Sequence, residues 1–195
     1  MFTFIHFNCL GGWTLIYRTI LQTSDKLYSY STADNYRDVF SYENTRVVPV
    51  AVLDQLKQDM GFSQLRFYCY KKQAGRTLHI MTKDSPEGEM VVRYFTNSTQ
   101  RPASCSSFTV LPDDTSVASQ HCSYWGNPFN QGEEKWGKSR SAEEDRLYRE
   151  PIFAHPGLKH ILYTIPDVGS LLYCDDHWDY NIQHSVGDKW LIFVR

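Results

Sequence analysis

The run Gly11-Gly12-Trp13-Thr14-Leu15-Ile16-Tyr17 constrains the fold more than any other feature of the chain. Two consecutive glycines permit a tight turn that a residue with a Cβ cannot follow. The β-branched and aromatic residues that follow them favour an extended strand with buried side chains. The sequence therefore predicts a turn that leads directly into a core strand.

Further strands are predicted in the middle and at the end of the chain. Residues 64–70 and 76–82 have the composition of a β-hairpin, joined by a turn at residues 71–75. Residues 89–95 are expected to add a third strand, which would make the middle of the chain an antiparallel meander. Residues 189–195 form an apolar run that predicts a closing strand.

One short helix is predicted between these strands. Leu53, Leu56 and Met60 recur at helical spacing, and Gly61 is suited to end the helix. The expected fold class is therefore α+β, an antiparallel sheet with few short helices. We expect one domain over residues 1–195, with a β-rich part at about 1–96 and a loop-rich part at about 97–195. The loop-rich part is the expected binding half, because long ordered loops are often functional.

Charge and hydropathy exclude several classes of protein. The chain has 195 residues and a formal net charge of -2, and its Lys and Arg residues form no strong cluster, so a nucleic-acid-binding protein is not expected. No apolar run approaches the roughly 20 residues of a transmembrane helix. The apolar start, residues 1–7, lacks the cationic region and cleavage site of a signal peptide. We interpret it as a strand whose preceding segment is missing, in a truncated part of a secreted protein.

The five cysteines favour an oxidising compartment. None belongs to a C-x-x-C pair, and the odd number leaves at least one without a partner in the chain. Cys105 and Cys122 flank a turn and are candidates for a disulfide that closes it. Cys69 is either a buried free thiol or the partner of Cys174. Asn97 begins an Asn-Ser-Thr sequon, which suits a glycosylated surface loop of a secreted or extracellular protein.

In this order the motifs resemble the fibrinogen C-terminal domain family, which includes ficolins, tachylectins and, more distantly, intelectins. The resemblance rests on the Gly-Gly-Trp-Thr opening, on the helix followed by Leu65-Arg66 and a Gly75 turn, and on the closing strand. It implies a first disulfide from Cys9 to an upstream cysteine that this chain does not contain. It also implies recognition of carbohydrate or acetylated surface groups, with calcium as a cofactor. Members of the family commonly act as multimers, so an oligomer is a further expectation.

Asp113 and Asp114 are the candidate calcium ligands. The resemblance places them at the approach to the family's calcium loop, although its alternating aspartates are reduced here to an adjacent pair. Calcium takes six to eight oxygen ligands, and residues 111–116 supply two carboxylates and two hydroxyls. The alternative is an Asx-turn or a helix N-cap, in which the same side chains hydrogen-bond to the backbone.

A second candidate site combines acids with aromatic rings, since a ring can stack on a sugar while carboxylates accept its hydroxyl groups. The acidic stretch at residues 174–180 would also suit zinc or manganese, and its simplest alternative is a solvated loop. The candidate ligand-binding residues are Tyr124, Trp125, Trp136, Asp175, Asp176, His177 and Trp178.

Three functions are weighed. The first is an extracellular, non-catalytic recognition domain that binds a carbohydrate or glycoprotein in a lectin-like manner, with a role in innate recognition. The second is a structural or protein–protein interaction module of a matrix or cell-surface protein. The third is a metal-dependent hydrolase that uses Asp175, His177 and His184, which is the least favoured because the sequence contains no nucleophile elbow or phosphate loop.

Overall fold

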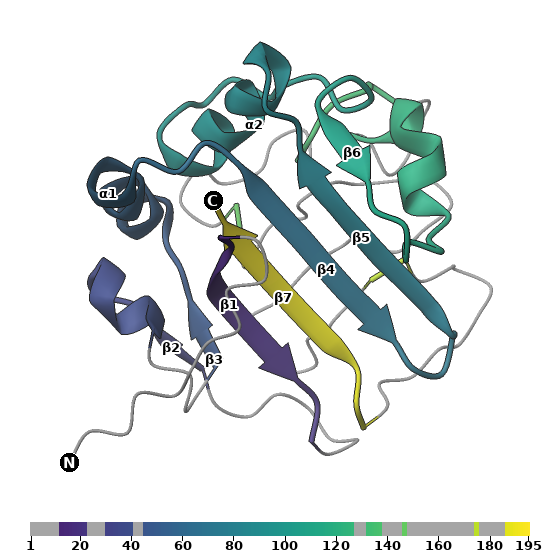
Figure 1. The fold of residues 1–195 in the computed structure, drawn as a ribbon, viewed down its shortest axis with the longest axis horizontal. Helices are drawn as coiled ribbons and strands as arrows, with labels where there is room; N and C mark the ends of the chain where they lie inside the picture. Colours follow the sequence, from purple (N-terminus) through teal and green to yellow (C-terminus); the bar gives the residue numbers. More distant parts are fainter. Residues whose placement is uncertain are drawn as a thin grey trace.

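The computed structural model describes residues 12–22, 30–40, 45–126, 132–137, 146–147, 174–175 and 186–195. Its centre is a five-stranded antiparallel sheet with the strand order β1-β7-β4-β5-β6. The strands are β1 (Thr14–Ile20), β4 (Leu65–Lys71), β5 (Arg76–Thr82), β6 (Phe108–Val110) and β7 (Lys189–Val194). The first and last strands of the chain are neighbours (Figure 1). The fold class is α+β.

The opening strand, the hairpin and the closing strand are confirmed. Gly12 has a φ of +79°, a left-handed conformation that glycine adopts without strain, and β1 begins two residues later. Within β1 the register shifts between Leu15 and Tyr17. This bulge turns both Ile16 and Tyr17 toward the core, although they are consecutive residues.

The prediction of a third strand at residues 89–95 is wrong, because Pro86–Thr96 forms the helix α2. Ser85 caps this helix by accepting a hydrogen bond from the Gly88 N–H, and a proline occupies the first turn. Val91, Val92 and Phe95 are all buried at helical spacing. The middle of the chain is therefore a hairpin followed by a helix, and not a three-stranded meander.

The predicted helix before the hairpin is confirmed as α1 (Val50–Met60), and Gly61 ends it with a φ of 69°. The described part also contains two short strands, β2 (Tyr30–Thr32) and β3 (Thr45–Val47), which pair in parallel. Two 3-10 helices complete it: η1 (Tyr36–Phe40) and η2 (Ala118–Tyr124). No helix among the described residues is long and apolar enough to cross a membrane.

The face of the sheet that packs against the helices is called the inner face. It carries alternate residues of the central strands, and each is at most 1 % exposed: Leu65, Phe67, Cys69, Leu78, Ile80, Trp190, Ile192 and Val194. An aromatic cluster lies against it. The ring of Phe67 is 5.7 Å from that of Phe95 on α2 and 5.6 Å from that of Trp136. Helix and sheet thus share one continuous core.

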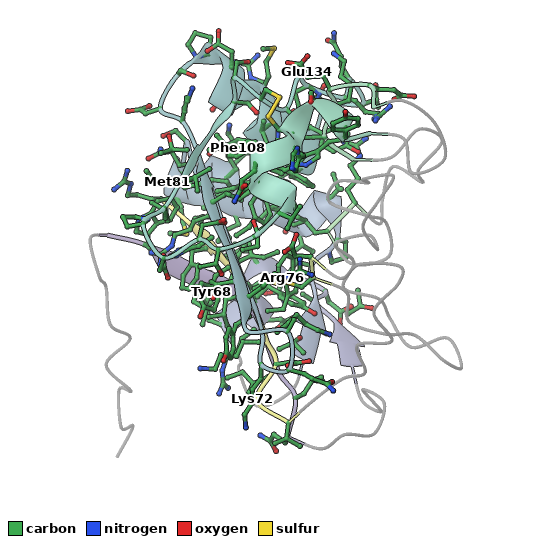
Figure 2. The ribbon with its side chains drawn as sticks, turned by 90° about the vertical axis from the view of Figure 1, so that its right-hand side faces the viewer. Tyr68, Lys72, Arg76, Met81, Phe108 and Glu134 are labelled. Atoms are coloured by element: carbon green, nitrogen blue, oxygen red, sulfur yellow. A yellow bond between two sulfur atoms is a disulfide. The ribbon has the colours of Figure 1, made fainter. Side chains whose placement is uncertain are left out.

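The opposite side, called the outer face, carries the other alternate residues. Figure 2 shows Tyr68 and Met81 on this side of the sheet, away from Arg76. Most of its side chains remain partly exposed, whereas those of the inner face do not. Strand pairing places the following residues on the outer face: Leu15, Arg18, Ile20, Arg66, Tyr68, Tyr70, Thr77, His79, Met81, Thr109, Lys189, Leu191 and Phe193.

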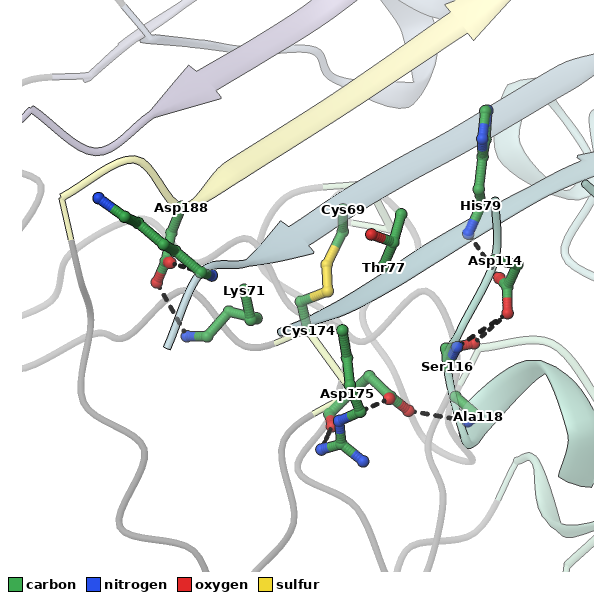
Figure 3. The surroundings of a disulfide bond; sticks show 12 residues. Cys69, Lys71, Thr77, His79, Asp114, Ser116, Ala118, Cys174, Asp175 and Asp188 are labelled. Atoms are coloured by element: carbon green, nitrogen blue, oxygen red, sulfur yellow. Dashed lines mark hydrogen bonds and ion pairs between the residues drawn. A yellow bond between two sulfur atoms is a disulfide. The ribbon is translucent and has the colours of Figure 1, made fainter. Parts of the chain in front are cut away.

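Two cysteine pairs lie at disulfide distance. Cys69 on β4 pairs with Cys174, with Cα atoms 6.2 Å apart (Figure 3), and Cys105 pairs with Cys122 at 5.1 Å. Of the two interpretations of Cys69, the structure shows the paired one. The fifth cysteine, Cys9, lies outside the described residues.

Candidate functional site

The Asp113–Asp114 turn follows β6 and folds back over β5. Asp114 accepts hydrogen bonds from the backbone N–H of His79 at 2.6 Å and from the Oγ of Ser119 at 2.8 Å. The N–H and Oγ of Ser116 also donate to it, both at 2.9 Å. These are the hydrogen bonds of an Asx-type turn, which is the alternative that the sequence left open.

The turn does not fit a calcium site. Both carboxylate oxygens of Asp114 accept protein N–H or O–H groups, whose positive ends would face a bound cation. Asp113 points instead to the ring of His79, at 2.5 Å. Among the described residues, no group of three or more His, Cys, Asp or Glu could hold a metal ion.

Asp175 is buried and ties three segments together (Figure 3). Its carboxylate accepts the N–H of Val117 at 3.0 Å and that of Ala118 at 2.8 Å, and so caps the start of η2. The guanidinium of Arg76 lies 3.3 Å away. Burial raises the pKa of Asp175, and Arg76 acts against that shift. All of these contacts hold the protein together and leave Asp175 1 % exposed.

Trp125 and Trp136 belong to the core and offer no surface for stacking on a ligand. Each is 0 % exposed, and their rings meet edge to face at 5.1 Å. The indole N–H of Trp125 donates to the Ala118 carbonyl, and that of Trp136 donates to the Ser107 hydroxyl. Of the ligand-binding residues predicted, Tyr124 is described and exposed, at 48 %. Asp176, His177 and Trp178, as well as His184 of the hydrolase hypothesis, lie outside the described residues.

The outer face of the sheet carries a polar chain that the sequence analysis did not single out. Arg66 Nε donates to Nε2 of His79 at 2.7 Å, and Nδ1 of His79 lies 2.5 Å from Asp113 Oδ1. Since Nε2 accepts a hydrogen bond, Nδ1 carries the proton, and this N–H donates a hydrogen bond to Asp113. The pairing of β4 with β5 sets this arrangement. Tyr68 is the partner of His79, and Arg66 lies two residues before Tyr68, at the next position on the same face.

His79 is a neutral connector between Arg66 and Asp113. Burial of its ring lowers the pKa of His79, and the nearby Arg66 charge lowers it further, although Asp113 opposes both. Both ring nitrogens are engaged, whereas a general base requires one nitrogen that can reach a substrate proton. The arrangement therefore orients Arg66, and neither ring nitrogen of His79 is left to accept a substrate proton.

The guanidinium of Arg66 is held between aromatic rings. It lies 4.9 Å from the ring centroid of Phe193 and 5.8 Å from that of Trp13. Arg195 lies over the same Trp13 ring at 4.8 Å, and the Gln64 side-chain carbonyl accepts its Nη2. Both guanidinium groups thus lie over the indole of Trp13. Arg66 is also hydrogen-bonded to His79, and Arg195 to Gln64. Such cation–π contacts contribute about 0.5–1 kcal/mol each at exposed sites.

Neither a protein-family model, nor a curated protein, nor a solved structure matches this chain. The outer face offers fixed N–H donors, positive charge and partly exposed rings on a sheet, which are groups that can bind a polar ligand.

Proposed function

We propose that this chain is an extracellular, non-catalytic recognition domain that binds carbohydrate in a lectin-like manner through the outer face of its sheet. The observation that carries the proposal is Arg66, which is oriented by His79 and held between Trp13 and Phe193. Guanidinium N–H groups donate to sugar oxygens, and neighbouring rings pack against the apolar face of a sugar. The donors are fixed before the ligand arrives, which reduces the entropy lost on binding.

The compartment in the proposal is supported by the cysteines. Two pairs at disulfide distance are typical of proteins that mature in oxidising compartments. The resemblance to fibrinogen-related domains agrees with the same location and with carbohydrate or acetylated groups as ligands.

A second candidate is a protein–protein interaction module. It is favoured by the partly exposed apolar residues Leu191, Phe193 and Met81 on the outer face, since such patches occur at protein interfaces. The two proposals use the same surface and differ in the ligand.

A glycan array probed with the oxidised protein tests the first candidate. We expect binding to at least one glycan class and a loss of about tenfold or more in Arg66→Gln, which removes a charged donor. The matched control is Arg93→Gln, an exposed residue on α2 that forms a surface ion pair with Glu89. Failure of the unmodified protein to bind any glycan, or equal losses in both variants, would contradict the proposal.

A further inference from the structure

The positive charges of the outer face surround an apolar centre. Along β7, Lys189, Leu191 and Phe193 alternate on this face, and Arg195 follows two residues later. Arg18 of β1 pairs with Leu191, and Arg66 of β4 pairs with Phe193. The four cations therefore lie around the side chains of Leu191 and Phe193.

These cations form no ion pairs with acids of the described strands, although Asp113 attracts Arg66 across the ring of His79. Among the described residues, no carboxylate forms an ion pair with Arg18, Arg66, Lys189 or Arg195. By contrast, the inner-face cation Lys71 lies 3.3 Å from Asp188. The described part of the outer face therefore carries a surplus of positive charge, although the formal net charge of the whole chain is -2.

We infer that the ligand of this face is a sulfated glycan, an inference that rests on the proposed function. The segment from Lys189 to Arg195 spans about 20 Å along the strand direction. A single ligand that contacts both ends of this span must carry several anionic groups along its length. A sulfated polysaccharide carries repeated negative charges beside apolar ring faces. The sulfates would lie on the four cations, and the sugar rings would pack on Leu191 and Phe193.

Arg66 suits sulfate in particular, whereas Nε and Nη2 of Arg195 already donate to the Gln64 side-chain carbonyl, so Arg195 would contribute mainly charge. A guanidinium presents a planar fork of N–H donors that matches two oxygens of one oxyanion. Nε of Arg66 is occupied by His79, which leaves its two terminal nitrogens for a ligand. Arg18 and Lys189 are both exposed and would supply charge at the rim.

The test is a binding titration of the oxidised protein with three oligosaccharides at several salt concentrations. They are a heparin octasaccharide, the same octasaccharide after desulfation and N-acetylation, and a neutral N-acetylglucosamine tetramer. We expect the heparin octasaccharide to bind at least about tenfold more tightly than either of the others, and to weaken as salt screens the charges. The double variant Arg18→Gln/Lys189→Gln should lose about tenfold or more of that affinity.

A matched double variant, Arg37→Gln/Arg93→Gln, removes the same charge from exposed positions on η1 and α2 and should retain the affinity. Equal binding of the three sugars would overturn the sulfated-glycan inference and leave the proposed function standing. Equal binding of the two octasaccharides, above the neutral tetramer, would assign the face to carboxylated sugars and overturn it as well. A DNA duplex is titrated as a further polyanion, and binding as tight as that of heparin would show an unspecific polyanion face and overturn the inference. No binding of any of the three sugars would overturn the sulfated-glycan inference, and the glycan array would then decide the proposed function.

Discussion

The two faces of the sheet differ in how they use charge. On the inner face, Lys71 and Asp188 form a buried pair beside fully buried rings, and Asp175 holds Arg76 at its margin. On the outer face, Arg66 rests on rings and on a neutral histidine, with no acid at ion-pair distance among the described residues. The charged groups of the inner face thus form ion pairs within the protein, whereas the cations of the outer face remain available to a ligand.

The comparison also separates two kinds of candidate residue. Of the loop residues selected from the sequence, Asp114 and Asp175 hydrogen-bond to turns and helix starts, and Trp125 and Trp136 are core rings. Arg18, Arg66 and Lys189 come from regular strands, where an alternating pattern places them on one face. Rigid strands position donors more precisely than loops do, which suits them to recognition.

The largest expected loss of stability follows removal of the Cys69–Cys174 disulfide, which joins the inner face to a distant segment. Cys69 and Cys174 are 105 residues apart, and Cys105 and Cys122 are 17 apart. Chain-entropy arguments give about 5 kcal/mol for the longer loop and about 3 kcal/mol for the shorter. We therefore expect Cys69→Ala/Cys174→Ala to lower the free energy of unfolding more than Cys105→Ala/Cys122→Ala, as measured by urea denaturation. The reverse order would contradict the role assigned to the inner-face pair.

A sequence-adjacent pair gives the next largest contrast. Trp125 is 0 % exposed and Tyr124 is 48 % exposed. Trp125→Ala should cost about 3–5 kcal/mol in the free energy of unfolding, because it empties a core position. Tyr124→Ala should change that free energy by less than about 0.5 kcal/mol. Thermal unfolding of the two variants measures the contrast, and similar losses would show that Trp125 is not a core residue.

The smallest expected effect is a pH dependence from the outer face. The pKa of His79 is lowered in the folded state, so the unfolded chain binds a proton more readily than the native protein does. His79 therefore contributes stability above its unfolded pKa of about 6.5, and this contribution is lost as the pH falls through the folded value. The free energy of unfolding of the unmodified protein should fall faster, as the pH drops below about 6.5, than that of His79→Asn. Parallel pH profiles would contradict the buried, neutral state of this ring.

Local patterns predicted the elements whose signals are short-range. The glycine turn before β1, the hairpin and the Gly61 helix end all depend on neighbouring residues. The prediction for residues 89–95 was wrong because the valines and aromatic residues of this segment favour a strand. The Ser85 cap and the burial of one side of the helix favour α2 instead. A serine followed by a proline is typical of a helix start, and in this segment that local preference outweighs strand propensity.

The site could not be predicted in the same way. The alternation in β4 places Arg66 and Tyr68 on one face, but it does not reveal that Phe193 lies beside Arg66. That neighbour follows from the strand order, in which the last strand of the chain enters between β1 and β4. Burial of Trp125 and Trp136 likewise depends on contacts with Phe108 and Phe67, which are distant in sequence.

A chemical-shift titration of the isotope-labelled protein with the heparin octasaccharide tests the central claim most directly. The account predicts that amide shifts among the described residues concentrate on β7 and on its two neighbours, around Arg18, Arg66, Leu191 and Phe193. Shifts confined to residues 111–124, with those strands unchanged, would contradict the claim that the outer face is the recognition surface.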